Sequence, residues 1–190
     1  MRLFLAIPIE PATQERLLNK VRELQGHSWS KDIKWIPAEN YHLTLHFLGG
    51  SLNDTQKNKI ITSMSHWFSE GMSAFDIEIK SIQLFPSKLH PHLITASLDS
   101  NIMMQCLVRE IEEQLKPLGF NPTKQAFRPH ITLGKILPTA DLSFLIQNSP
   151  LIKLNDFTLK VNKITLFEST ISQPYPTYTP LSEILLECYD

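Results

Sequence analysis

Cysteine is scarce in this sequence, and it has no long apolar runs. Only Cys106 and Cys188 occur among the 190 residues, which excludes a disulfide framework and a cysteine-based zinc site. Each is expected to be a small buried residue. No run approaches the roughly 20 apolar residues of a membrane-spanning helix, and Glu10 and Pro11 interrupt the apolar start at residues 2–8 without a cleavage site, which indicates a strand. The sequence predicts a soluble, cytoplasmic protein.

An excess of charge of one sign is also absent. The 18 Lys and Arg residues oppose 19 Asp and Glu, for a formal net charge of −1. This balance excludes a strongly basic protein that coats nucleic acid through bulk electrostatics, but it leaves room for a local patch that binds one or two phosphates. A chain of this length can bury a core without a metal or disulfide. We expect a single domain over residues 1–190, made of two intimately packed lobes.

The periodicity of the apolar residues predicts helices and strands in alternation. Helices are expected around residues 17–24, 60–68, 103–115 and 139–147. Strands are expected at residues 2–8, 33–37, 41–50, 75–82, 92–98, 128–136, 157–169 (a long strand or a bent pair) and 178–189. Asp54 is the expected cap of the second helix. This order favours an α+β protein with mixed sheets, and its recurring pattern suggests two similar lobes.

A tetrapeptide that occurs twice carries the chemical information. His42-Leu43-Thr44-Leu45 lies in the first half of the chain and His130-Ile131-Thr132-Leu133 in the second, both within expected strands. Alternate side chains of a strand share a face, so each His lies about 6.6 Å from its Thr on one face, while the aliphatic residues point into a core. One copy of the tetrapeptide would be weak evidence for a functional site. Two copies with aliphatic residues at the same positions are much less expected by chance. The plainer alternative is that two buried strands each tolerate a hydrogen-bonded histidine.

Two such His/Thr pairs suit acid–base chemistry on a phosphodiester. The ordinary imidazole pKa of about 6.5 allows one ring to be protonated while the other is neutral near neutral pH. One ring could then remove a proton from water, and the other could donate a proton to the leaving oxygen. The threonine hydroxyls could stabilise charge on the remaining oxygens. This chemistry requires no metal, and the sequence offers no dense cluster of Asp, Glu and His.

The paired motifs resemble those of the 2H phosphoesterase superfamily. The residues around them are similar to its LigT-like branch, the bacterial and archaeal RNA 2′,3′-cyclic phosphodiesterases. The resemblance covers nearly the whole chain and is carried by the segments RLFLAIPI, WIPAENYHLTLHFLG, QLFPSKLHP, AFRPHITLGK and ITLFEST with a later Tyr.

The resemblance implies a bilobal α+β fold with antiparallel or mixed sheets, in which the two pseudo-symmetric lobes each bring one motif to a central cleft. It implies hydrolysis of a 2′,3′-cyclic phosphate at an RNA 3′ end, or of a small cyclic nucleotide, to a 2′-phosphomonoester without cofactor or metal. His42 would be the proton donor to the 3′-oxygen, His130 the base that activates water, and Thr44 and Thr132 the phosphate-holding residues. Some relatives join RNA ends through 2′,5′ linkages, which leaves a ligase-like activity open. We expect a monomer.

The chain departs from the family pattern at two positions where an arginine is common. Lys135 follows the second motif, and His92 follows the FP loop. Lysine keeps the charge of arginine but lacks its bidentate fork. Strand alternation predicts that Lys135 points away from His130, whereas Arg128 shares the face of His130 and could direct its guanidinium at a phosphate. A surface ion pair is the alternative for Arg128.

The residues that flank the motifs carry weaker predictions. His46 continues the alternation of His42 and is expected to lie behind the substrate-contacting groups or at the solvent edge. Most of the neighbouring aromatic residues are expected in the core, with Phe127 or Trp35 as the candidate to stack on a base. These aromatic residues are Trp35, Phe47, Phe85 and Phe127.

Two other functions compete with the hydrolase interpretation. The near-zero charge and the two missing arginines would also suit a module that binds RNA ends without turnover. His90 and His92 have the His-x-His spacing of some metal sites, which would suit a metal-dependent hydrolase, although the sequence shows no accompanying pair of carboxylates.

Overall fold

The computed structural model describes residues 2–68, 71–123 and 125–187. Its strands are β1 (Arg2–Pro8), β2 (Ile33–Trp35), β3 (His42–Gly49), β4 (Phe75–Phe85), β5 (Leu93–Leu98), β6 (His130–Ile136), β7 (Ile152–Lys153), β8 (Thr158–Val161), β9 (Lys163–Thr170) and β10 (Thr177–Leu185). Its α-helices are α1 (Pro11–Gln25), α2 (Asp54–Met64), α3 (Ile102–Leu115) and α4 (Ser143–Asn148). None of these helices is long and apolar enough to cross a membrane.

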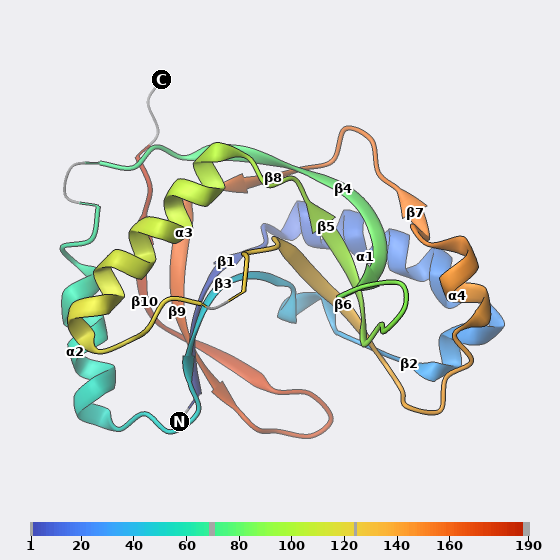
Figure 1. The fold of residues 1–190 in the computed structure, drawn as a ribbon, viewed down its shortest axis with the longest axis horizontal. Coiled ribbons are helices and arrows are strands. Elements are labelled where there is room, and N and C mark those ends of the chain that lie inside the picture. The colour runs from blue at the N-terminus through green and yellow to red at the C-terminus, as the bar shows by residue number, and fades with distance from the viewer. Residues whose placement is uncertain (1, 69–70, 124, 188–190) are drawn as a thin grey trace.

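The strands form one sheet whose order is β10-β9-β1-β3-β6-β5-β4-β7, with β2 also paired to β6 and β8 to β4. The two halves of this sheet meet where β3 pairs with β6 through Leu43 and Ile131. In Figure 1, α2 and α3 lie at the end of the molecule that holds β9 and β10, whereas α4 and β7 lie at the opposite end. The expected α+β fold is therefore confirmed.

The sheet is of the antiparallel kind rather than the mixed kind. All ladders between the strands named above are antiparallel, and parallel pairing is found in the isolated bridge between Ser73 and Glu187. Alternation of helices and strands suggested mixed sheets, but the helices here connect strands that run in opposite directions.

The second helix is bounded differently from the prediction. Its cap is Asn53, not Asp54: the Asn53 side chain accepts a hydrogen bond from the Gln56 backbone, and the Gln56 side chain accepts one from the Asn53 backbone. This reciprocal capping box satisfies two backbone donors that a cap at Asp54 would leave open. The helix ends at Met64, before Phe68, whose backbone is left-handed (φ 56°).

One further prediction needs adjustment. The buried stripe of α3 contains Met104 rather than Met103, which is exposed. Of the two alternatives for residues 157–169, a long strand or a pair, the structure has the pair, β8 and β9. Cys106 is free and half-buried on α3, whereas Cys188 lies outside the described residues.

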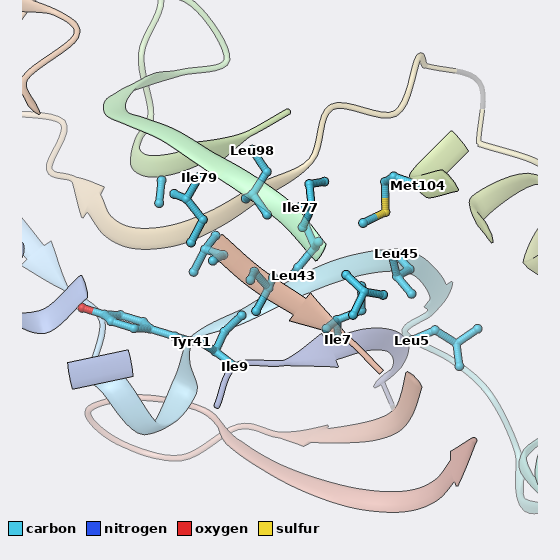
Figure 2. Close-up of a cluster of buried hydrophobic side chains, with 14 of the residues drawn as sticks. Leu5, Ile7, Ile9, Tyr41, Leu43, Leu45, Ile77, Ile79, Leu98 and Met104 are labelled. Atoms are coloured by element: carbon cyan, nitrogen blue, oxygen red, sulfur yellow. The ribbon is translucent and has the colours of Figure 1, made fainter. Parts of the chain in front are cut away.

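The core lies on one face of the sheet. Figure 2 shows its side chains meeting from both halves: Leu5, Ile7, Leu43 and Leu45 come from β1 and β3, Ile77, Ile79 and Leu98 from β4 and β5, and Met104 from α3. Because side chains alternate along a strand, burial of Leu43 and Ile131 on this face leaves the opposite face to the His and Thr residues of the two motifs. We call that opposite face the motif face.

Candidate active site

The two repeated motifs lie side by side at the junction of the two halves. His42 is the first residue of β3 and His130 the first residue of β6. The strands are antiparallel with Leu43 opposite Ile131, so extending this register by one residue places the His of each motif across from the Thr of the other. Diagonal neighbours in such a pair have Cβ atoms about 7–8 Å apart. The structure therefore brings both predicted histidines and both predicted threonines onto one patch.

Each imidazole is oriented by a backbone carbonyl two residues upstream. His42 Nδ1 lies 2.7 Å from the Asn40 oxygen, and His130 Nδ1 lies 2.8 Å from the Arg128 oxygen. A carbonyl oxygen can only accept a hydrogen bond, so Nδ1 carries the proton in both rings. The Nε2 lone pair of each neutral ring is left available to accept a proton.

The surroundings lower the pKa of both histidines and so favour their neutral forms. Burial lowers the pKa of His42; the hydrogen bond to the Asn40 carbonyl opposes this shift, and the charge of His130 adds to it. Burial also lowers the pKa of His130, against its hydrogen bond to Arg128, whose guanidinium lowers this pKa further. Two protonated imidazoles at diagonally neighbouring positions would repel each other. An anion bound between them would favour the protonation of one ring.

Aromatic rings pack against His42 from the first half of the sheet. The ring of Phe4 on β1 lies 5.0 Å from the imidazole, centroid to centroid, and Tyr178 on β10 meets it edge-on at 5.1 Å. Phe167 stacks on Phe4 at 5.4 Å. These rings fix the orientation of the imidazole and exclude water from one of its sides.

The second half repeats this arrangement around His130. Phe85, at the end of β4, stacks on the imidazole with ring centroids 4.1 Å apart. The Arg128 guanidinium lies 4.6 Å from the centroid of the same Phe85 ring and donates a hydrogen bond to the Pro86 carbonyl (2.8 Å). Arg128 is thus near His130, as predicted, with guanidinium N–H groups left for an anion. Phe85 was expected in the core and instead contacts the second histidine.

A β-bulge immediately after the first motif reverses the alternation of β3. Thr44 pairs with Ala6 of β1, but His46 pairs with Leu5, so β3 contains one extra residue at this point. His46 therefore turns to the core side, where it is 6% exposed. Its Nδ1 lies 3.4 Å from the Thr123 hydroxyl and 4.0 Å from a carboxylate oxygen of Glu112. The prediction that His46 shares the face of His42 is wrong for this reason.

The same bulge brings Phe47 to the motif face. Phe47 was expected in the core, but it is 74% exposed and lies opposite Phe4, with ring centroids 6.0 Å apart. An exposed phenyl ring beside the aromatic residues around His42 can stack on a nucleobase. Strand alternation alone gave no signal for this placement.

A second bulge follows the second motif in the equivalent place. Thr132 pairs with Thr95 of β5, but the next residue of β5, Ile94, pairs with Gly134, so β6 also contains one extra residue. Lys135 consequently shares the motif face instead of pointing away from it. A Cβ atom on Gly134 would lie 2.6 Å from Cγ2 of Ile33, so a side chain at this bulge would collide with β2.

The two aromatic residues predicted to stack on a base lie elsewhere. Trp35 is on the core side of β2, near Gly134, and its indole N–H donates a hydrogen bond to the Ser30 hydroxyl (2.8 Å). Phe127 lines a hollow of about 390 Å³ beside α3, together with Glu112 and Thr123. The aromatic residues on the motif face are instead Phe47 and Tyr178. The bulge in β3 places Phe47 on this face, and the order of the strands places Tyr178 near His42. Local sequence spacing predicts neither placement.

The described residues contain no group of three or more His, Cys, Asp or Glu side chains placed to hold a metal ion. His90 and His92, the alternative metal ligands, lie in the loop between β4 and β5, where the His92 backbone donates a hydrogen bond to the Phe85 carbonyl (2.8 Å).

Comparison with known proteins agrees with this arrangement. The model of the LigT like Phosphoesterase family matches residues 7–95 and 104–178. The chain belongs to this family. An RNA 2′,3′-cyclic phosphodiesterase of Methanocaldococcus jannaschii is 29% identical over 184 residues, 96% of this chain and 99% of that protein. One of Thermotoga maritima is 25% identical over 191 residues, 99% of this chain and 95% of that protein.

Solved structures share the fold. TT0787 of Thermus thermophilus matches with a TM-score of 0.79 at 20% identity, and the match covers 100% of both chains. Escherichia coli LigT in complex with 3′-AMP matches with a TM-score of 0.72 at 19% identity, over 97% of both chains. The match to the family model, together with these relatives, confirms the resemblance to the LigT-like branch.

Proposed function

We propose that this LigT-like phosphoesterase is an RNA 2′,3′-cyclic phosphodiesterase that opens the cyclic phosphate at an RNA 3′ end to a 2′-phosphomonoester. The observation that carries the proposal is the pairing of the two motifs about Leu43 and Ile131, with both Nδ1 atoms bonded to carbonyls. The curated relatives that share most of their length with this chain have the same activity in their names.

The proposed reaction is an in-line displacement at phosphorus. Nε2 of neutral His130 accepts a proton from water as the water oxygen bonds to phosphorus. The bond from phosphorus to the 3′-oxygen breaks, and Nε2 of protonated His42 gives its proton to that oxygen, so the phosphate stays on the 2′-oxygen. The hydroxyls of Thr44 and Thr132 bind the non-bridging oxygens. The same displacement with a 5′-hydroxyl in place of water would join two RNA ends by a 2′,5′ linkage.

The lowered pKa of His42 fits this role because the substrate supplies a negative charge. An anionic phosphate beside the imidazole favours its protonated form. Bound substrate would therefore favour the charged form of the proton donor, which burial disfavours in its absence. Arg128 would add a second positive group on the side of His130, and Phe47 would stack on the terminal base.

The test is incubation of the purified protein with a short RNA that ends in a 2′,3′-cyclic phosphate, in excess chelator. We expect a 2′-phosphate product, and a rate lower by about 10²–10⁴-fold in His42→Ala and in His130→Ala. His66→Ala, at an exposed histidine next to α2, is the matched control and should retain the full rate.

Other outcomes would contradict the proposal. Saturable binding of an RNA that stays intact would indicate an RNA-end binding module. Turnover that chelator abolishes and that requires His90 or His92 would indicate a metal-dependent hydrolase. Normal turnover in both histidine variants would show that the acid–base assignment is wrong.

A further inference from the structure

A buried hydroxyl group on the motif face lacks a hydrogen-bond partner. Thr95 of β5 is fully buried, and no partner for its hydroxyl oxygen is found among the described residues. Its neighbours along the strand, Ile94 and Ala96, belong to the core, so the Thr95 side chain points to the motif face. A buried polar group without a partner costs free energy of folding. Packing alone therefore does not account for a hydroxyl at this position.

Thr95 lies directly opposite Thr132 of the second motif. Residues in such a cross-strand pair have Cβ atoms about 4.5–5.5 Å apart, so rotation about χ1 can bring two threonine hydroxyls within hydrogen-bond distance. The neighbouring pair of strands contains a bond of this kind. Ser81 of β4 lies directly opposite Ser97 of β5, and their hydroxyl oxygens are 3.0 Å apart. The sheet thus allows hydroxyls of opposite residues to bond across two strands.

The neighbour of Thr95 on its other side lies farther from the candidate active site. This neighbour is Gln83 of β4, and its side-chain oxygen accepts a hydrogen bond from the Ser81 hydroxyl (3.4 Å). Thr132, in contrast, lies in the second motif. A hydrogen bond from Thr95 to Thr132 would therefore act on the group that faces the phosphate.

The first half of the sheet carries alanine at the equivalent position. Thr44 lies opposite Ala6 of β1, next to the bulge in β3, just as Thr132 lies opposite Thr95, next to the bulge in β6. Ala6 is fully buried, so a methyl group is enough to fill this position in the fold. The Thr95 hydroxyl therefore distinguishes the half of the sheet that holds the proposed base, His130, from the half that holds the proposed proton donor.

We propose that Thr95 is a positioning residue for Thr132: its hydroxyl donates a hydrogen bond to the Thr132 hydroxyl oxygen and so directs the Thr132 O–H group at a non-bridging oxygen of the phosphate. This inference rests on the proposed function. A hydroxyl that accepts one hydrogen bond becomes a stronger donor in the next. A donor that is already oriented also needs no rearrangement when negative charge develops on the phosphate oxygen. Thr95 acts through Thr132 and does not itself contact the phosphate.

The experiment replaces the Thr95 hydroxyl with a methyl group. Thr95→Val should lower kcat/KM for a trinucleotide that ends in a 2′,3′-cyclic phosphate about five-fold, and Thr95→Ser, which keeps the hydroxyl, should restore it. In a Thr132→Val background, Thr95→Val should have no further effect, because the group that it positions is gone. The urea midpoint of Thr95→Val should equal or exceed that of the wild type, because the variant removes an unpartnered buried hydroxyl.

Thr165→Val is the matched control. Thr165 of β9 is also a fully buried threonine, but its hydroxyl donates a hydrogen bond to the Glu183 carboxylate (3.3 Å). We expect this variant to lower the urea midpoint and to leave the kcat/KM of the folded protein unchanged. A similar loss of kcat/KM in Thr165→Val would overturn the proposal, because the effect would then not be specific to the neighbour of Thr132.

The remaining outcomes separate this inference from the proposed function. An unchanged kcat/KM in Thr95→Val, or an equal loss with and without the Thr132 hydroxyl, would show that Thr95 does not act through Thr132. A lowered urea midpoint together with a loss that Thr95→Ser does not restore would indicate a structural role instead. Binding of a nucleoside 2′-phosphate provides a readout without turnover. If the wild type leaves the trinucleotide intact but Thr95→Val weakens this binding only when Thr132 is present, the proposed function fails and the positioning role stands.

Discussion

Leu43 and Ile131 face each other across the pairing of β3 and β6, and the two His/Thr motifs are arranged about this pair. The two aliphatic side chains point into the core. The His and Thr residues that flank each of them along the strand point to the motif face. Because the strands are antiparallel, each half of the sheet supplies one histidine and one threonine to the same patch. The chemistry of the patch depends on this pairing.

The pH dependence of catalysis should reflect the lowered pKa values of the two histidines. Burial lowers the pKa of both His42 and His130, so kcat/KM, which reports the free enzyme, should be greatest below the ordinary histidine value of about 6.5 and fall toward pH 8. The maximum of kcat should lie at higher pH, because bound phosphate favours the protonated form of His42. Rates from pH 4.5 to 8.5 check this, and a kcat/KM that stays constant from pH 6.5 to 8.5 would contradict it.

Substitution of Phe47 should weaken substrate binding without destabilising the fold. The ring is 74% exposed, so Phe47→Ala should change the free energy of unfolding by less than about 0.5 kcal/mol. Loss of stacking on one base should weaken the free energy of binding by about 1–3 kcal/mol. Phe47→Tyr keeps an aromatic ring and should restore this binding. Titration with the 2′-mononucleotide product, which the proposed reaction does not consume, measures the difference. Phe144→Ala, at an exposed ring on α4, is the control, and equal weakening in both variants would refute the stacking role.

Gly134→Ala should destabilise the protein. The added methyl group would lie 2.6 Å from Cγ2 of Ile33, so β2 must shift, which costs about 1–3 kcal/mol in a packed region. Urea unfolding measures this loss. Gly26→Ala is the control, because that glycine has helical backbone angles and its nearest neighbour would lie at 3.4 Å. An unchanged midpoint for Gly134→Ala would show that the bulge tolerates a side chain.

The buried His46 should make the fold less stable in acid. Burial lowers its pKa, although the Glu112 carboxylate opposes the shift. The unfolded chain then binds more protons than the folded chain below about pH 6.5, so stability is complete above that pH and falls as the pH drops through the folded pKa. His42 and His130 act in the same direction. Urea midpoints from pH 5 to 7.5 should fall less steeply in His46→Asn than in the wild type, and parallel curves would refute this role.

Local sequence patterns predicted the strands of both motifs and the shared face of each His/Thr pair, because alternation holds within a regular strand. They did not predict the bulge at the end of each motif. The extra residues, Leu45 in β3 and Leu133 in β6, reverse the alternation, and the signal for a bulge lies in the pairing partner. Phe47 and Lys135 were therefore assigned to the wrong face.

The rings beside the histidines were missed for a related reason. Phe4 and Phe85 lie far from His42 and His130 in the chain, and only the order of strands in the sheet brings them together. The cap at Asn53, in contrast, was available from the sequence, because Gln56 follows it at capping-box spacing.

The hydrogen bonds from Nδ1 of each histidine end on main-chain oxygens, those of Asn40 and Arg128. Replacing either of these side chains leaves the carbonyl acceptor in place. The assignment of the proton to Nδ1 is therefore a property of the backbone path that enters each strand. In the proposed reaction, both imidazoles would therefore keep Nε2 facing the phosphate even if the side chain at position 40 or 128 were changed.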